Sequence, residues 1–169
     1  MLCEDRVRYV GDAVALVGAE TKEIAEKALD LMVTRGLSRE AFGKKLVWLG
    51  GNIEIISRAR IEIESMRLMV LKAAKAMDVL GNREARVWVH MVKALVPERV
   101  CHIIDQAIQM HGATGVSQWT PLSRMYASQR TLRLADGPDE VHHLVVGRNE
   151  VHAYARSGED ATSAVVWRS

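Results

Sequence analysis

The stretch ISRARIEIESMRLMVLKAAKAMDVL, residues 56–80, carries the strongest structural signal in the chain. Its apolar residues recur at alternating steps of three and four, which places them along one side of an α-helix. Residues 89–110 repeat this spacing after an interruption. Two long helices with sustained apolar stripes predict an antiparallel helical bundle. The first stripe consists of Ile56, Ala59, Ile63, Met66, Val70, Ala73, Met77 and Leu80, and the second of Val89, Val92, Val96, Val100, Ile103, Ala107 and Met110.

Residues that break helices bound these stripes. The run GGN over residues 50–52 precedes the first stripe, and Gly81 with Asn82 follows it. Glycine lowers helix stability and can adopt backbone angles that turn the chain, so a helix is expected to end at Gly81. Pro97 lies inside the second stripe, and the ring of proline predicts either a kink or the start of a new helix there.

The segments outside the two stripes give weaker signals. Residues 7–18, VRYVGDAVALVG, are rich in β-branched residues and contain two glycines, which predicts one or two short strands. Thr21 resembles an N-cap and predicts a helix over roughly residues 21–42. Two further helices are predicted over residues 121–134 and from Pro138 to about residue 156. Residues after 156 are polar and resemble a frayed tail.

The expected fold is therefore all-α: an up-and-down four-helix bundle with a short N-terminal β or extended segment. The predicted divisions are an N-terminal extension over residues 1–20, a helical bundle over residues 21–156, and a polar tail over residues 157–169. A chain of 169 residues is long enough to bury one substantial core. With a single Phe, that core must be built from aliphatic residues and methionine.

Composition excludes several classes of partner. The net charge is only +2 and basic residues do not cluster, so nucleic acid and membrane surfaces are not expected partners. The N-terminus lacks the apolar run of a secretory signal, and no run of about 18 apolar residues occurs. Two cysteines, Cys3 and Cys101, suit a reducing compartment. The sequence therefore predicts a soluble protein of the cytosol or mitochondrial matrix that is not secreted.

A metal centre is the first chemistry to test in a helical bundle. A di-iron site would require Glu and His three residues apart on two helices, and only one such pair, Glu140 and His143, occurs. The histidines do not repeat a ligand spacing, so we expect no metal and interpret them as surface or hydrogen-bonded side chains. The six histidines are His90, His102, His111, His142, His143 and His152.

Three motifs, in this order along the chain, resemble the C-terminal helical domain of acyl-CoA dehydrogenases. They are REAFGK at residues 39–44, QMHGATGV at residues 109–116, and LADGPDEVH at residues 134–142. The resemblance covers about residues 24–155, and the wording of the third motif is most similar to the branch that contains phosphotransferase-fused animal enzymes and their bacterial relatives. It implies an FAD-dependent oxidoreductase of fatty acid metabolism that forms the 2,3-double bond of an acyl-CoA thioester.

The resemblance also assigns a role to Asp136. In the family, a carboxylate on this loop removes the α-proton of the thioester while the β-hydrogen leaves as hydride to the flavin. Most members have Glu there, and Asp is one methylene shorter, so substrate or backbone must come closer. A carboxylate enclosed by flavin and acyl chain loses hydration and becomes a stronger base. The alternative is that Asp136 only caps the helix that follows Pro138.

Flavin contacts implied by the resemblance are spread along the chain. Arg39 would neutralise a pyrophosphate and Phe42 would lie against the adenine, both reaching into a neighbouring subunit of a homo-oligomer. Ala113 stands where the family usually has a second glycine, which narrows the allowed backbone angles. The alternative for Arg39 is an ordinary surface arginine. The complete set of implied cofactor-binding residues is Arg39, Phe42, Gln109, Gly112, Ala113 and Glu140.

Two features limit what this chain can do. Residues before about 24 depart from the family pattern and resemble a strand and helix of molybdenum hydroxylase large subunits, although one such fragment implies no molybdopterin chemistry. Family members also have roughly twice this length, with an N-terminal helical domain and a middle β-barrel that complete the acyl pocket. We therefore expect an oxidoreductase domain that is inactive alone. The alternatives are a non-catalytic helical oligomerisation module and a chimeric or engineered fragment.

Overall fold

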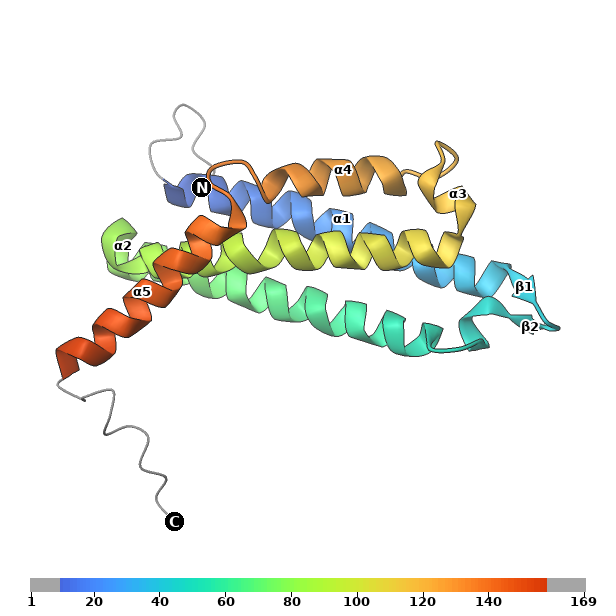
Figure 1. Ribbon diagram of the computed structural model, residues 1–169, viewed down its shortest axis with the longest axis horizontal. Helices are drawn as coiled ribbons and strands as arrows, with labels where there is room; N and C mark the ends of the chain where they lie inside the picture. The colour runs from blue at the N-terminus through green and yellow to red at the C-terminus, as the bar shows by residue number, and fades with distance from the viewer. Residues whose placement is uncertain (1–9, 158–169) are drawn as a thin grey trace, which may run out of the picture.

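The computed structural model describes the backbone of residues 10–157 and the side chains of residues 21–155. Five helices account for most of this part of the chain (Figure 1). They are α1 (Val10–Ser38), α2 (Asn52–His111), α3 (Ala113–Val116), α4 (Leu122–Leu132) and α5 (Asp139–Ser157). A two-stranded hairpin, β1 (Glu40–Ala41) and β2 (Lys44–Lys45), and the 3-10 turn η1 (Leu46–Trp48) connect α1 to α2.

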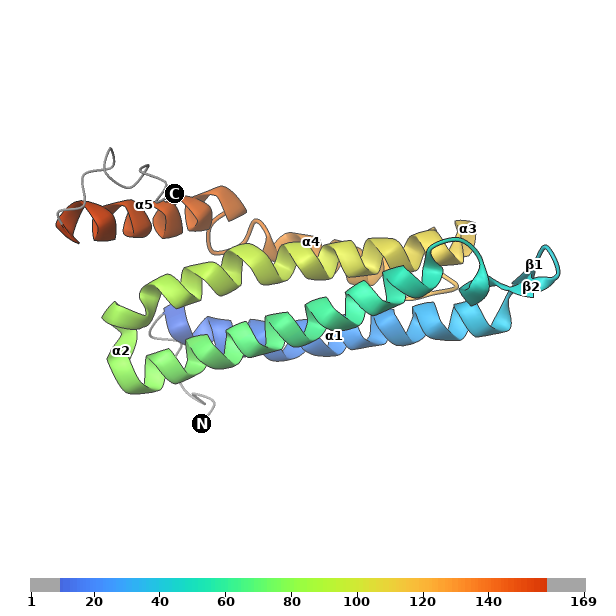
Figure 2. The same ribbon diagram turned by 90° about the horizontal axis from the view of Figure 1, so that it is seen from below.

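Helix α2 is two antiparallel arms rather than one rod. Its backbone leaves helical geometry only at Gly81, where φ is 76° and ψ is 172°. Figure 2 shows that the chain doubles back at this end of the bundle. We call residues 52–80 the first arm and residues 82–111 the second arm. The predicted helix end at Gly81 is confirmed, because the observed angles are accessible essentially to glycine alone.

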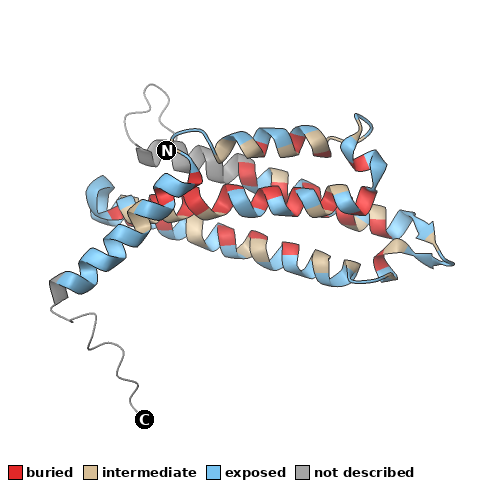
Figure 3. Ribbon diagram, viewed as in Figure 1, coloured by how far each residue is buried: buried red, intermediate tan, exposed pale blue. Residues whose placement is uncertain are grey.

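The core fills the space between α1, the two arms of α2, and α4. Buried residues recur along α1, both arms of α2 and α4, whereas most of α5 is exposed and leaves the bundle (Figure 3). The predicted all-α, four-helix bundle is therefore confirmed, and both apolar stripes supply its centre. The buried core cluster consists of Ala25, Ala28, Leu29, Met32, Ala59, Ile63, Met66, Ala73, Val92, Val96, Val100, Ile103, Ile104, Ala107, Met110, Leu122 and Met125.

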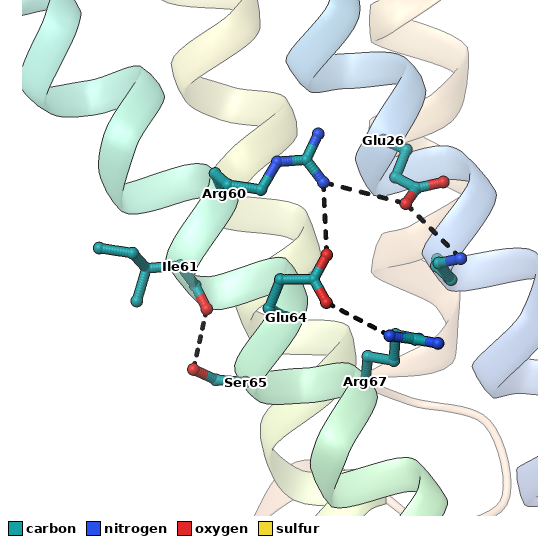
Figure 4. Close-up of polar contacts among 7 residues, drawn as sticks. Glu26, Arg60, Ile61, Glu64, Ser65 and Arg67 are labelled. Atoms are coloured by element: carbon teal, nitrogen blue, oxygen red, sulfur yellow. Dashed lines mark hydrogen bonds and ion pairs between the residues drawn. The ribbon is translucent and has the colours of Figure 1, made fainter.

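A row of ion pairs lies along the exposed edge of the interface between α1 and the first arm, and one of its pairs joins the two helices. Glu26 of α1 forms an ion pair with Arg60 at 4.0 Å, and Arg60 also pairs with Glu64 at 3.5 Å (Figure 4). Arg67 extends the row, 3.6 Å from Glu64. These side chains are roughly half exposed, so each pair contributes about 1 kcal/mol or less, and apolar burial remains the main source of stability.

Three sequence predictions about the first half of the chain are wrong. Strands were predicted over residues 7–18, but α1 begins at Val10; residues 7–9 lie outside the described part. Thr21 is not an N-cap, because it lies buried in the middle of α1. The same helix ends at Ser38 and not near residue 42. Residue propensities differ by only about 1 kcal/mol, so a tertiary context easily extends or ends a helix against them.

Most predictions for the chain after residue 49 are confirmed. The breaker run before the first arm is confirmed, since α2 starts at Asn52. The helices predicted after Pro121 and Pro138 are observed as α4 and α5. Pro97 neither breaks nor restarts the second arm, because helical geometry continues through it and the residue is buried in the bundle. No helix among residues 10–157 has the length and apolar content needed to cross a membrane.

Replacing Gly81 with alanine should lower the free energy of unfolding by about 1–3 kcal/mol, because a Cβ is strained at these backbone angles. Urea denaturation at fixed protein concentration measures the change. Gly147→Ala is the matched control, since Gly147 lies inside α5 and a Cβ there meets no atom within 4 Å. It should leave stability unchanged or raise it slightly. A Gly81→Ala protein as stable as the wild type would contradict the glycine-dependent reversal.

Candidate functional site

The residues implied by the sequence motifs lie at two ends of the bundle. The β1–β2 hairpin, with Arg39 and Phe42, lies at the same end as α3 in both views (Figures 1 and 2). Gln109, Gly112 and Ala113 belong to the junction of α2 and α3 at that end. Asp136 and Glu140 lie at the opposite end, where α4 gives way to α5. The structure therefore brings the predicted residues into two groups, which we call the hairpin end and the loop end.

The hairpin presents an aromatic side chain to solvent. Glu40 pairs with Lys45 and Ala41 with Lys44, so Phe42 and Gly43 form a two-residue turn with φ values of 51° and 75°. Two consecutive positive φ values are the geometry of a tight hairpin turn that matches the twist of its strands. Phe42 is 96% exposed at the tip. An exposed phenyl ring in a strained turn gains nothing from folding of this chain alone, which favours a role in binding.

The junction of α2 and α3 is a glycine turn. Gly112 ends α2 with φ 62°, and a Cβ there would meet no atom within 4 Å. Gly115 is required for a different reason, which is lack of space: a Cβ added there would lie 2.6 Å from the carbonyl oxygen of Ile108. Ala113 is not among the described residues with positive φ, so alanine is compatible with the first position of α3. Gln109 and Ala113 are both exposed.

The Asp136 loop is a left-handed turn between two helices. Asp136 has φ 54° and Gly137 has φ 102°. Aspartate tolerates this region better than most residues, and glycine adopts it freely. The amide of Asp139 donates to the carbonyl of Arg133 across the turn at 3.3 Å. The turn thus closes on itself and carries Asp136 at its outer side.

Charged side chains fix the turn from both sides. Lys93 of the second arm reaches across from α2, and its Nζ donates to the carbonyl of Leu132 at 2.5 Å and to that of Gly137 at 3.4 Å. Burial lowers the pKa of Lys93, with the carboxylates of Asp139 and Asp136 opposing that effect. Arg133 donates from Nε to Asp139 at 2.6 Å. This hydrogen bond raises the pKa of Arg133.

The carboxylate of Asp136 is left unengaged by this arrangement. The side chain is exposed, and no hydrogen bond or ion pair to it is found among the residues whose side chains are described. Helix α5 begins three residues later at Asp139, so the structure gives no support to the alternative that Asp136 serves as a helix cap. Glu140 is likewise exposed on the first turn of α5.

The contact between two histidines at the loop end was not predicted from the sequence. His90 and His142 are buried, and their Nδ1 atoms lie 2.8 Å apart. His111 is also buried, with its Nδ1 bonded to the Ala107 carbonyl at 2.8 Å, whereas His102 and His143 are exposed. The interpretation of the histidines as surface or hydrogen-bonded side chains is confirmed for these five. No cluster of three potential metal ligands exists within the part of the chain that was searched.

The loop-supporting residues Lys93, Arg133 and Asp139 were also missed. Lys93 lies between Val92 and Val96 of the second apolar stripe, and this position indicates that the methylene groups of its side chain are buried. The ion pair between Arg133 and Asp139 has no signal in the sequence, because it forms across a turn with an irregular path.

These features define an antiparallel helical-bundle domain that presents polar groups at its two ends. The family model described as "Acyl-CoA dehydrogenase, C-terminal domain" matches residues 12–151. Acyl-CoA dehydrogenase family member 10 of Mus musculus is 49% identical over 141 residues, which cover 83% of this chain and 13% of that protein. The chain therefore belongs to the acyl-CoA dehydrogenase family and corresponds to its C-terminal domain.

Solved structures agree with this assignment. One from Mycobacterium abscessus, assigned as an acyl-CoA dehydrogenase, has a TM-score of 0.83 and 45% identity, covering 85% of this chain and 35% of that one. PigA, solved with FAD and proline, has a TM-score of 0.76 at 21% identity and covers 83% of this chain and 36% of that one, which shows the fold alone. The chain spans about a third or less of the length of these relatives.

Replacing Lys93 with methionine should loosen the Asp136 loop while preserving the buried stem. Hydrogen bonds from a charged donor contribute roughly 1.5–3 kcal/mol, so amide hydrogen exchange over residues 133–140 should accelerate on the order of tenfold or more. Lys75→Met, at an exposed position of the first arm, is the matched control and should leave these amides unchanged. Equal protection of the loop in both variants would contradict the anchoring role of Lys93.

Proposed function

We propose that this chain supplies the catalytic base and part of the flavin site of an FAD-dependent acyl-CoA dehydrogenase, with Asp136 as the base. The observation that carries the proposal is the contrast within one loop. Arg133, Asp139 and Gly137 are all held by hydrogen bonds, while the exposed carboxylate of Asp136 makes no hydrogen bond or ion pair with the described residues. A rigid loop that presents one unengaged carboxylate suits a general base, which must be positioned and must remain free to accept a proton.

The reaction assigned to Asp136 is removal of the α-proton of an acyl-CoA thioester. The carboxylate would take that proton as the β-hydrogen departs, leaving a double bond between carbons 2 and 3. FAD, when bound, would supply the oxidising power by accepting the β-hydrogen as hydride. The described residues contribute the position of Asp136. Enclosure of the thioester, which strengthens electrostatic catalysis, would have to come from protein outside this chain.

The hairpin end fits the adenosine diphosphate half of FAD. Arg39 is exposed and can neutralise a pyrophosphate, Phe42 offers an exposed ring for adenine, and Gly112 leaves open space beside its backbone. Gln109 and Ala113 are exposed at the same end of the bundle. PigA, a structural neighbour, was solved with FAD. We therefore propose Arg39, Phe42, Gln109, Gly112 and Ala113 as contacts for the dinucleotide, and Glu140 as a contact near the isoalloxazine.

The hairpin end and the loop end of one chain lie too far apart to be treated as neighbouring parts of one flavin site. Lys93 touches the Asp136 loop and Gly112 ends the same helical arm. At 1.5 Å rise per residue, the stretch between them is roughly 28 Å long. We propose that the hairpin end of one copy contacts the flavin served by Asp136 of another copy, so the active enzyme is a homo-oligomer. Acyl-CoA is the proposed substrate, and the cytosol or mitochondrial matrix the proposed location.

A second candidate function, a helical module for oligomerisation, is favoured by the outer face of the first arm. Ile61 is 62% exposed and Leu68 is 65% exposed, at positions seven residues apart on one helix. Val79 is similarly exposed further along the same arm. Apolar residues outside the core-facing stripe call for a second partner. This candidate requires no flavin, so the absorption spectrum of the purified protein separates it from the first.

The catalytic proposal is tested in a chimera that joins this chain to the N-terminal and middle parts of a full-length relative. Asp136→Asn should retain flavin absorbance while lowering turnover by on the order of 10²–10⁴-fold, the usual contribution of a positioned base. Asp136→Glu should be tolerated better. The isolated chain should show no turnover. Asp105→Asn, at an exposed position of the second arm, is the control. Near-normal turnover of Asp136→Asn would show that the base is another group.

The self-association proposal is tested on the chain itself by light scattering at tens of micromolar. The wild type should be larger than a monomer. Leu68→Glu should shift it toward monomer, because a buried unpaired charge opposes docking, while circular dichroism remains helical. Gln118→Glu introduces the same charge at an exposed position outside the helices and should have no effect. A wild-type chain that is entirely monomeric would contradict the interface.

A further inference from the structure

A row of hydrogen bonds runs from the second arm of α2 to the Asp136 loop. Arg86 Nε lies 3.3 Å from Nε2 of His90. Nδ1 of His90 lies 2.8 Å from Nδ1 of His142, the latter on the first turns of α5. Nε2 of His142 lies 3.2 Å from the carbonyl oxygen of Gly137, the residue after Asp136. Both imidazoles are buried, so each link replaces a contact with water.

The groups that begin and end this row, the Arg86 guanidinium and the Gly137 carbonyl, determine which nitrogen of each histidine carries a proton. A carbonyl oxygen only accepts, so His142 must carry its proton on Nε2, and in the neutral ring Nδ1 is then an acceptor. His90 must accordingly donate from Nδ1, which leaves its Nε2 as an acceptor. Arginine only donates, so the Nε–H of Arg86 completes the row. A single pair of tautomers therefore satisfies all four ring nitrogens while both histidines are neutral.

We propose that His90 and His142 are positioning residues that fix the Gly137 carbonyl, and through it the Asp136 carboxylate, by this directional row of hydrogen bonds. The proposal rests on the proposed role of Asp136 as base. His142 donates to the carbonyl of Gly137, the residue after Asp136, and His90 holds His142 in the one tautomer able to do so. The same two side chains also fasten α5 to α2, since their rings lie 5.0 Å apart at 43° across that interface.

An extra proton is incompatible with the complete row. On His90 it would occupy Nε2 and oppose the Arg86 N–H; on His142 it would occupy Nδ1 and oppose the His90 N–H. The surrounding charges act in the same sense. Burial lowers the pKa of His90, with His142 and Arg86 adding to the effect. Burial also lowers the pKa of His142, as does the charge of Lys93. Hydrogen bonds from the imidazole to the backbone of Gly137 and Asp136, and the charge of Asp139, oppose this effect.

The sign of the pH dependence follows from these lowered pKa values. The unfolded chain, whose histidines titrate near about 6.5, binds protons more readily than the folded one. The row is therefore complete at neutral and higher pH. Its contribution to stability declines as the pH falls below the unfolded value, and the decline ends once the pH is below the folded pKa values.

The decisive experiment is long-range ¹H–¹⁵N spectroscopy of histidine in the full chain, titrated with pH. At pH 7.5, His142 should carry its proton on Nε2 and His90 on Nδ1. Both should titrate below about 6.5, the ordinary pKa of histidine. The opposite tautomer at either residue, or titration of both at or above the ordinary pKa of histidine, would overturn the proposal. This part requires no mutation, so it decides the matter even if a variant fails to fold.

Paired variants separate positioning from packing. An asparagine side chain can place an N–H near Nδ1 of histidine, whereas glutamine extends toward Nε2. His90→Asn should therefore preserve the His142 tautomer and the amide signal of Gly137. His90→Gln should release that tautomer to a mixture and shift the Gly137 signal, and His143→Gln should change neither. If His90→Gln leaves both signals unchanged, His90 does not position the loop. These signals do not depend on turnover, so they stand or fall separately from the test of Asp136.

Discussion

Burial of two apolar stripes on one continuous segment is the constraint on which the rest of this structure depends. Each arm of α2 carries an apolar side that water disfavours, and the reversal at Gly81 turns those sides toward one another. Once the arms are antiparallel, α1 and α4 cover the remaining apolar surface. The ion pairs of Figure 4 lie at the edge of this arrangement, where solvent weakens them, and follow from it.

The same constraint places the functional groups. Every residue implied in flavin or substrate chemistry lies at an end of the bundle, because the helix interiors are occupied by core packing. The hairpin end offers exposed groups on tight turns, and the loop end offers a carboxylate on a braced turn. Lys93 and His90 belong to the arm that forms the core, yet their polar atoms reach the loop end. The core helix thus also serves as the scaffold of the loop, which couples the position of Asp136 to bundle packing.

Sequence reasoning succeeded where one physical period extends over many residues. The stripes from Ile56 to Leu80 and from Val89 to Met110 gave the helices, the reversal and the bundle. It failed where the outcome depends on residue propensities that differ by only about 1 kcal/mol, or on distant neighbours. Residues 10–18 form helix despite their β-branched content, and Phe42 turns in a hairpin where a helix end was expected. Asp136 was identified by its resemblance to a family motif, since one carboxylate has no period to reveal it.

The sequence by itself determined the helical stripes, their breaks and the motifs that assign the chain to its family, because these depend on neighbours along the chain. Only the tertiary structure decided that His90 meets His142, that Lys93 reaches Gly137, and that the two groups of site residues lie at opposite ends. Such contacts join residues far apart in sequence. Their geometry depends on the packing of whole helices, which local spacing does not encode.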